Sequence, residues 1–280
     1  MLFTLKSTLT LPVILLALLT PARAAETQSD FVGESDPDVI NALKFSGQKR
    51  SIKDSLRLLD QAMAKHPERL YLHSWKARLL AEIYESEAAI KEADIVLARE
   101  ANNVLALGVK ARALANLGQP EASLAIFQKA LKLKPENSYL LSQRGRLLRG
   151  EKRYGEALKD FDRLVKQDEG DSINRSERAY CLMGLGGRAN MEKACRDLEI
   201  INQMTRLKNY NSISRLGRIY TELGRFDKAE ETLKAGIAKH PVIVQLQADL
   251  LKVYESSGQT EKARQQKIKL TRIEEELGLR

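Results

Sequence analysis

One pattern of residue types returns at a spacing of about 34 residues along most of this chain, starting at Asp36. A fixed period of about 20–50 residues is typical of stacked repeats, in which each unit buries its apolar face against the next unit. The period therefore predicts an array of seven small units, more than the roughly three that stability requires. Numbered 1 to 7, the blocks are residues 36–69, 70–103, 104–137, 138–171, 172–209, 210–243 and 244–280.

The positions within a block carry the residue types that a helix-turn-helix needs. Positions 8, 20 and 27 are small, which lets two helices approach closely, and positions 11 and 24 are large and apolar. Glycine at position 15 ends the first helix because it adopts a left-handed backbone at little cost, and proline at position 32 stops the second. Blocks 3 and 6 show these types best, with Ala111, Leu114, Gly118, Ser123, Phe127, Ala130 and Pro135 in one and Gly217, Tyr220, Gly224, Ala229, Leu233, Gly236 and Pro241 in the other.

This pattern resembles the tetratricopeptide repeat, and the resemblance extends over all seven blocks. It implies an all-α fold, a right-handed α-solenoid of about seven helix-turn-helix units over residues 36–280. Four blocks depart from the pattern. Block 1 has Leu43 at position 8, and blocks 2 and 4 have Ala101 and Glu169 in place of the proline. Block 5 holds about four extra residues in or after its hairpin turn, near Leu185–Asn190. The last helix, about Thr260–Leu277, is expected to cap the stack or to dock a partner.

Residues 1–24 have the composition of a secretory signal peptide. Lys6 supplies a positive charge, Leu9–Leu19 form an apolar run, and a small-x-small cleavage site ends at Ala24. Cleavage there leaves Ala25–Ser35 as a flexible polar leader and no membrane span in the mature chain. The alternative is a membrane anchor, although the apolar run is shorter than the ~20 residues that span a bilayer. The expected location is periplasmic or secreted, as in bacterial export.

The charge of the mature chain favours acidic partners. The formal net charge is +9, and removal of residues 1–24 takes away Lys6 and Arg23 and no acid, which leaves +7. A basic exported protein attracts anionic peptides, polymers or membrane surfaces. Export argues against nucleic acid as a partner.

Cys181 and Cys195 are the only cysteines, and both belong to block 5, on either side of its hairpin turn. An exported protein can form disulfides, and antiparallel helices bring such positions near each other. A bridge would close a loop of about 15 residues and stabilise the fold by about 3 kcal/mol. The alternative is two buried free thiols that act as small apolar side chains.

Nothing in the sequence predicts an enzyme, a cofactor or a metal site. His66 and His240 each precede a proline that ends a helix, and His73 has no second metal ligand at a useful spacing. The glycine-rich segment Leu182–Gly187 follows no strand and is typical of a helix end and turn. We therefore expect a non-catalytic protein without a cofactor.

The resemblance implies that positions 2, 5, 9, 12 and 13 of each first helix line a concave groove. Position 9 is cationic in six of the seven blocks, and position 5 is small almost throughout. Because positions 5 and 9 are one helical turn apart, a small residue and a long cation share one face of each helix. The candidate groove residues are Lys44, Tyr71, Ser74, Arg78, Arg112, Tyr139, Ser142, Arg146, Arg149, Tyr180, Arg218 and Lys252.

A groove of this kind would bind an extended anionic ligand, because arginine forks bind carboxylates and tyrosines add flat apolar contact. The predicted partner is a protein or an acidic peptide of the cell envelope, and the second hypothesis is an anionic cell-envelope polysaccharide. The alternative is that position 9 only faces solvent and that its long cations pair with acids on adjacent helices, such as Glu82 or Glu222.

Position 6 shows no matching order of the residues with which some tetratricopeptide proteins bind C-terminal carboxylates, so that partner is not expected here. Trp75, the only tryptophan, is predicted to pack between blocks 1 and 2. Position 6 reads Asn41, Trp75, Val109, Gln143, Glu177, Arg215 and Asp249.

Overall fold

A computed structural model describes residues 36–43 and 49–279, and within these ranges the chain forms fourteen α-helices and no strand. The all-α fold that the resemblance implies is confirmed. The predicted signal peptide, its cleavage site at Ala24 and Ala25, the leader and Lys44 lie outside the described residues. The helices are α3 (Pro37–Leu43), α4 (Lys49–Lys65), α5 (Tyr71–Glu82), α6 (Ser86–Arg99), α7 (Val104–Asn116), α8 (Pro120–Leu133), α9 (Ser138–Gly150), α10 (Tyr154–Gln167), α11 (Ser172–Leu185), α12 (Arg188–Met204), α13 (Tyr210–Glu222), α14 (Phe226–Lys239), α15 (Val244–Ser256) and α16 (Thr260–Glu276).

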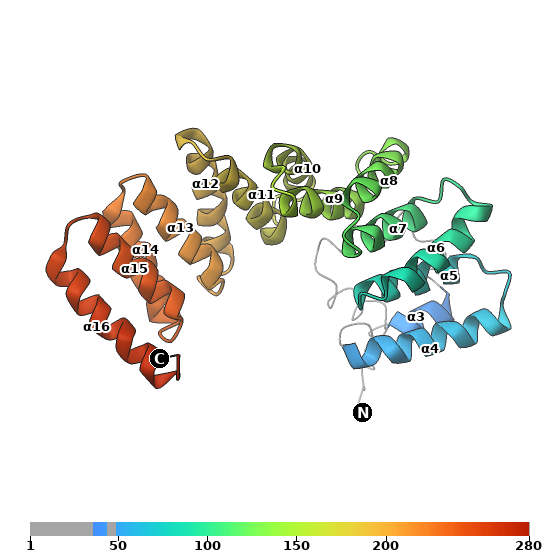
Figure 1. Cartoon of the computed structure of the whole chain (residues 1–280), viewed down its shortest axis with the longest axis horizontal. Helices are drawn as coiled ribbons and strands as arrows, with labels where there is room; N and C mark the ends of the chain where they lie inside the picture. The colour runs from blue at the N-terminus through green and yellow to red at the C-terminus, as the bar shows by residue number, and fades with distance from the viewer. Residues whose placement is uncertain (1–35, 44–48, 280) are drawn as a thin grey trace, which may run out of the picture. The chain divides into compact units, whose positions relative to one another are not determined.

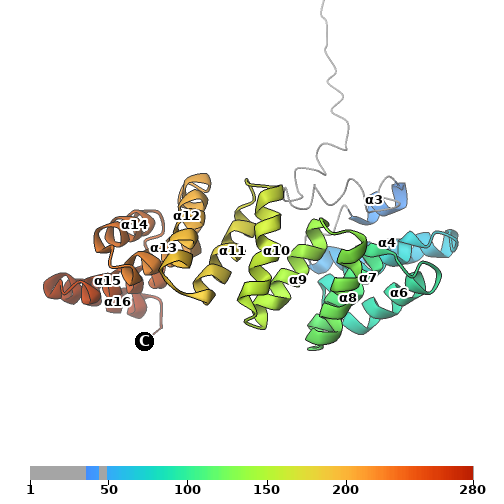
Figure 2. The same cartoon turned by 90° about the horizontal axis from the view of Figure 1, so that it is seen from above.

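Each block contributes one pair of helices, from α3 and α4 in block 1 to α15 and α16 in block 7 (Figures 1 and 2). The second helix of a pair packs against the first helix of the next, as α6 does against α7 and α14 against α15. First helices of neighbouring blocks also touch, as α5 and α7 do, and α13 and α15. Packing contacts divide the chain into two compact units, unit 1 ending at Leu147 and unit 2 beginning at Leu148.

The turn between the two helices has the left-handed backbone that the glycines predict. Position 15 has a positive φ in blocks 2 to 7, including the two blocks in which it is not glycine, at Tyr84 (65°) and Lys152 (58°). In block 3, the N–H of Gln119 donates to the carbonyl of Leu114 at 2.9 Å, which closes the end of the first helix. The glycines at position 15 are Gly118, Gly186, Gly224 and Gly258.

Four of the six turns between the seven blocks supply a side-chain cap for the next first helix. The last residue of a block is asparagine or aspartate at four boundaries, and its side chain accepts a hydrogen bond from a backbone N–H of the first helical turn. Asp171, for example, accepts from the N–H groups of Ile173 and Asn174 at 2.7 and 3.1 Å. The other three caps are Asn103, Asn137 and Asn209.

Small residues allow the helices of a pair to approach as closely as predicted. A Cβ atom on Gly217 would lie 2.6 Å from the side chain of Leu233, and one on Gly236 would lie 2.5 Å from that of Ile213. Such distances are too short for real contacts, so positions 8 and 27 of block 6 admit only glycine without a shift of their neighbours.

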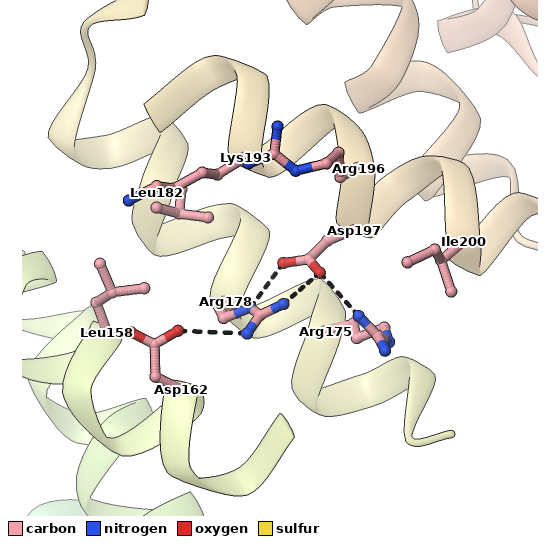
Figure 3. Close-up of a pocket in the computed structure, with 9 residues that line it drawn as sticks. All are labelled: Leu158, Asp162, Arg175, Arg178, Leu182, Lys193, Arg196, Asp197 and Ile200. Atoms are coloured by element: carbon pink, nitrogen blue, oxygen red, sulfur yellow. Dashed lines mark hydrogen bonds and ion pairs between the residues drawn. The ribbon is translucent and has the colours of Figure 1, made fainter. Parts of the chain in front are cut away.

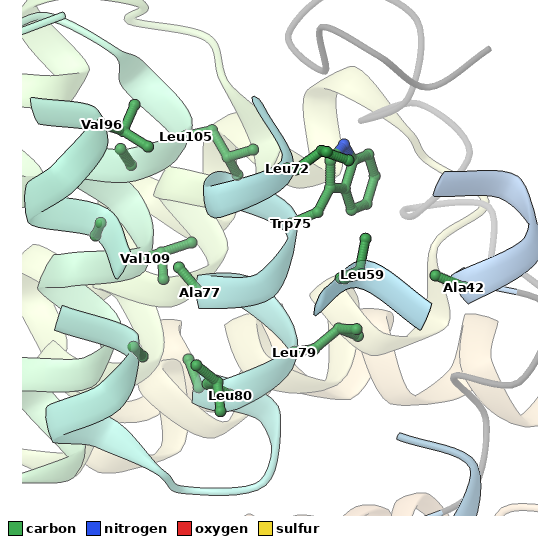
Figure 4. Close-up of a cluster of buried hydrophobic side chains, with 14 of the residues drawn as sticks. Ala42, Leu59, Leu72, Trp75, Ala77, Leu79, Leu80, Val96, Leu105 and Val109 are labelled. Atoms are coloured by element: carbon green, nitrogen blue, oxygen red, sulfur yellow. The ribbon is translucent and has the colours of Figure 1, made fainter. Parts of the chain in front are cut away.

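Each unit has its own apolar core. The core of unit 1 joins α3 and α4 to α5, α6 and α7, and Trp75 lies in it with 3% of its surface exposed (Figure 4). The prediction that Trp75 packs between blocks 1 and 2 is confirmed, because Ala42 and Leu59 belong to the same cluster. The core of unit 2 runs from α11 to α15 and centres on fully buried residues such as Leu198 and Ile219.

The extra residues of block 5 lengthen its second helix. Helix α12 has 17 residues, whereas α10 has 14. The buried residues Ala194 and Leu198 lie three places further along α12 than Ala157 and Phe161 lie along α10. The insertion therefore forms nearly one additional turn at the start of α12, because two successive glycines with positive φ already make the hairpin turn before it.

The disulfide considered for block 5 is not formed, and both Cys181 and Cys195 are free and buried. The groups around Cys181 include Arg149 and Asp162 of the preceding block, whereas those around Cys195 include Arg225 of the next block. Burial raises the pKa of Cys181 to about 12 and that of Cys195 to about 11, so both act as small apolar side chains.

Candidate functional site

The predicted groove residues of unit 1 mostly have partners within the fold. Tyr71 donates its hydroxyl to Asp36 at 2.5 Å, which ties the start of α5 to the start of α3. The guanidinium of Arg78 lies 5.7 Å from the ring centre of Trp75 and 5.8 Å from that of Tyr139. Tyr139 is buried, so the aromatic pair around Arg78 belongs largely to the packing of unit 1.

Position 5 lies deeper than a groove position would. Ser74 is only 2% exposed and Ser214 only 6%, while Ser142 and Ser176 are half-buried. A methyl group on Gly108 would lie 2.7 Å from Leu140, so this position packs against the next first helix. Position 5 therefore sets how closely first helices approach, and long side chains at neighbouring positions reach past it.

The position-9 cations differ in their surroundings. Arg78 is within 3.8 Å of Glu82, but both residues lie on the same helix, whereas the solvent-facing alternative anticipated acids on adjacent helices. Arg112 is half-buried and makes no ion pair with any residue in 36–43 or 49–279. Arg146, Arg218 and Lys252 are exposed.

In unit 2 the first helices hold a cluster around Tyr180. The guanidinium of Arg149, at the end of α9, lies 4.9 Å from the ring centre of Tyr180, and that of Arg215 on α13 lies 5.3 Å from it. Arg149 also pairs with Glu177 at 2.9 Å. These four residues, Arg149, Glu177, Tyr180 and Arg215, form what we call the Tyr180 cluster.

Arg215 is the cation of the Tyr180 cluster whose charge is least compensated. Its Nη1 donates to the hydroxyl of Ser176 at 3.0 Å, and within the described part of the chain it forms no ion pair. Burial lowers the pKa of Arg215 from its usual value, and the carboxylate of Glu177 only partly offsets this effect. A half-buried cation with a neutral partner gains from an anion placed beside it.

The next first helix adds a second buried polar contact to this face. The carboxyl of Asp249 on α15 accepts from Ser214 at 2.5 Å and from Gln245 at 2.9 Å. Burial raises the pKa of Asp249, and the nearby cation Arg218 opposes this rise. Both hydrogen bonds of Asp249 come from neutral groups, and Asp249 forms no ion pair with Arg218.

The sequence pattern identified Tyr180 and Arg149 but missed Arg215, Glu177 and Asp249. These three occupy position 6 of blocks 5 to 7, where they alternate in charge. The alternation was visible in the sequence. Its meaning depends on the direction of each side chain across neighbouring helices, and a list of residue types does not give that direction.

The described residues contain no group of three or more histidine, cysteine, aspartate or glutamate side chains that could hold a metal ion. His73 contacts Glu92 at 2.6 Å, and His240 contacts the backbone carbonyl of Leu207 at 2.8 Å. These histidines therefore have structural partners. None of the helices in the described ranges is long and apolar enough to cross a bilayer.

Comparisons with known proteins agree with the repeat pattern. Residues 109–172 and residues 212–241 each match a family model. Both match the tetratricopeptide repeat. The resemblance is thus supported for blocks 3, 4 and 6, while no curated protein sequence matches the chain.

Solved structures of tetratricopeptide repeat proteins share the fold. YrrB, described as a TPR protein with an unusual peptide-binding site, is 21% identical with a TM-score of 0.57, over 67% of this chain and 95% of its own. MamA from Desulfovibrio magneticus is 20% identical with a TM-score of 0.54, over 60% of this chain and 93% of its own. A tetratricopeptide repeat protein from Parabacteroides merdae is 18% identical with a TM-score of 0.54, over 84% of this chain and 91% of its own. At these identities the likeness concerns the fold alone.

Proposed function

We propose that this protein is a non-catalytic scaffold that binds an extended acidic peptide or protein segment on the first helices of unit 2. The observation that carries the proposal is Arg215, a half-buried cation that donates to a neutral serine and forms no ion pair among the described residues. A ligand carboxylate beside it would gain a charge-assisted hydrogen bond in a partly desolvated place.

The neighbours of Arg215 suit a peptide in particular. Arg149 and Tyr180 provide a flat surface on one side of it, and the exposed Arg218 and Lys252 follow along α13 and α15. Cations on successive first helices can each face one acidic side chain of an extended peptide, because such a peptide presents its side chains at regular intervals. The peptide-binding site that names YrrB gives a precedent for this use of the repeat fold.

An anionic polysaccharide would satisfy the same cations, but it also needs an open aromatic face on which a sugar ring can pack. Tyr180 already has two guanidiniums beside it, and the ring of Tyr154 lies 6.3 Å away. The acidic peptide is therefore the ligand that we propose. Because residues 1–24 have the composition of a signal peptide, its source is a protein of the cell envelope.

The test compares matched peptides and matched variants. Fluorescently labelled decapeptides with alternating Glu residues, the same peptides with Gln, and an oligogalacturonate are titrated into the protein and followed by anisotropy. We expect the Glu peptides alone to bind, and Arg215→Gln to weaken binding about tenfold or more, since a hydrogen bond to a charged group is worth ~1.5–3 kcal/mol.

The control is Arg264→Gln, which removes the same charge from an exposed site on α16 and should leave peptide affinity unchanged. Equal affinity for the Glu and Gln peptides would contradict the proposal. So would unaltered binding by Arg215→Gln. Binding of the oligogalacturonate in place of the peptides would assign the site to a polysaccharide.

A further inference from the structure

Unit 2 also has a pocket of about 390 Å³ between α10, α11 and α12. It lies among the second helices of blocks 4 and 5 and contains none of the residues of the Tyr180 cluster (Figure 3). Its volume is in the range of small-molecule sites. Leu158, Leu182 and Ile200 give it apolar walls, and the remaining lining residues are Asp162, Arg175, Arg178, Lys193, Arg196 and Asp197.

Two arginines share one buried carboxylate in this pocket. Asp197 is 2% exposed and accepts from Nε and Nη2 of Arg178 at 2.8 and 2.6 Å. It also accepts from Nη1 of Arg175 at 3.1 Å, and Arg175 is itself only 8% exposed (Figure 3). Arg178 reaches the exposed Asp162 at 3.3 Å with its remaining nitrogen. The buried part of the pocket thus holds two cations and one anion.

Block 2 has the same arrangement of four side chains and serves as the reference for block 5. Lys76 pairs with Glu92 and with Asp60 at 2.8 Å each, and His73 contacts Glu92 at 2.6 Å. Once the three extra residues of α12 are counted, Lys76 and His73 occupy the positions of Arg178 and Arg175. Glu92 and Asp60 occupy the positions of Asp197 and Asp162. In block 2 one lysine and one histidine face two carboxylates, so the arrangement there needs no further anion.

Block 5 adds two more cations to this arrangement. Lys193 and Arg196 line the pocket from α12, three residues apart, and both are exposed. Neither side chain forms an ion pair or a hydrogen bond with any residue of the described ranges. Four cations therefore face two carboxylates around a pocket with apolar walls. The unbalanced positive charge next to apolar surface defines the ligand that fits.

We propose that this pocket binds a small organic anion with a short apolar body, of which a six-carbon carboxylic acid is the simplest example. The anionic group lies between Lys193 and Arg196, where the planar guanidinium can donate two parallel hydrogen bonds. The hydrocarbon part covers Leu158, Leu182 and Ile200, which gains free energy from the apolar area removed from water. Neither an inorganic anion nor a neutral apolar molecule satisfies both halves of the pocket.

Three probes test the charged part of the pocket and its apolar walls separately. The full-length protein, labelled with ¹⁵N, is titrated with hexanoate, with hexanamide of the same shape but no charge, and with acetate of the same charge but no body. We expect hexanoate to saturate and to shift the amide signals of Lys193–Ile200, while hexanamide and acetate bind at least tenfold more weakly. Absence of saturation by hexanoate, or equal binding of hexanamide, would overturn the proposal.

The variants identify the residues. Lys193→Gln with Arg196→Gln should weaken hexanoate binding about tenfold, with an unchanged melting temperature because both side chains are exposed. The matched control is Arg264→Gln with Lys267→Gln, an exposed pair at the same spacing on α16, which should leave hexanoate binding unchanged. Unaltered binding by the first double variant would refute the assignment.

A third variant keeps this site distinct from the peptide site. Arg215→Gln should retain hexanoate binding while it loses the acidic peptides. If Arg215→Gln instead abolishes hexanoate binding, the probe occupies the Tyr180 cluster and the proposed pocket is wrong.

Discussion

At the scale of single residues, position 15 keeps a left-handed backbone even in blocks where it is not glycine. Six successive blocks adopt the left-handed conformation there, and Tyr84 and Lys152 do so with side chains. A non-glycine residue in this conformation costs about 1–2 kcal/mol. Tyr84 is 71% exposed, so little packing offsets that cost.

Tyr84→Gly and Lys152→Gly should therefore stabilise the fold. We expect each to raise the free energy of unfolding by about 0.5–1 kcal/mol, because relief of strain exceeds the extra unfolded-state entropy of glycine. Urea denaturation followed by circular dichroism measures the change. Gly118→Ala is the opposite control and should cost about 1 kcal/mol. A loss of stability in both glycine variants would show that this conformation is not strained.

At the scale of elements, an ion pair between blocks recurs along the array. A cation at position 7 reaches the acid at position 25 of the preceding block: Lys76 to Asp60, Lys110 to Asp94 and Arg178 to Asp162. In block 2 burial acts to raise the pKa of Glu92, but the hydrogen bonds from Lys76 and His73 outweigh it. The pKa of Glu92 therefore lies below its usual value of 4.5.

A carboxylate whose folded pKa is lowered stabilises the fold above its unfolded pKa, and this stabilisation is lost as pH falls through the folded pKa. Glu92→Gln should therefore cost about 1–2 kcal/mol at pH 7 and almost nothing at pH 3. Urea denaturation at both pH values measures the difference. Glu231→Gln, an exposed glutamate on α14, should show no such dependence. An equal cost at both values would mean that Glu92 acts through packing alone.

The sequence predicted the elements better than the contacts between them. The period located the helix pairs, the left-handed turn and the close contacts at Gly217 and Gly236, because each follows from the residue type at one position. It could not predict the ion pairs between blocks or the Tyr180 cluster, because these depend on how side chains meet across helices. The sequence left open whether the extra residues of block 5 lie in the turn or after it, since an insertion beside a turn can join either the turn or the helix, and the structure places most of them at the start of α12.

At the scale of the whole molecule, one helix serves two proposed sites. Tyr180 and Arg178 are two residues apart on α11, and residues at this spacing point to different faces of a helix. Tyr180 meets Arg149 and Arg215 on one face, while Arg178 meets Asp197 on the other. A repeat with two helices thus offers unit 2 two separate surfaces, one for an extended chain and one for a small anion.

Cleavage or retention of residues 1–24 determines where the protein is located, and this location determines which acidic peptides and small anions it can encounter. Expression of the full chain in a Gram-negative host should give a protein in the periplasm whose first residue is Ala25, because a small-x-small site ends at Ala24. N-terminal sequencing and intact mass measure this.

Ala24→Asp places a charge at the cleavage site and should leave the chain uncleaved and held at the membrane, whereas Ala64→Asp, an exposed position on α4, should be processed normally. A wild-type chain that keeps residues 1–24 and stays in the membrane would establish the anchor instead. In that case the peptide and the small anion would have to be sought at the membrane surface.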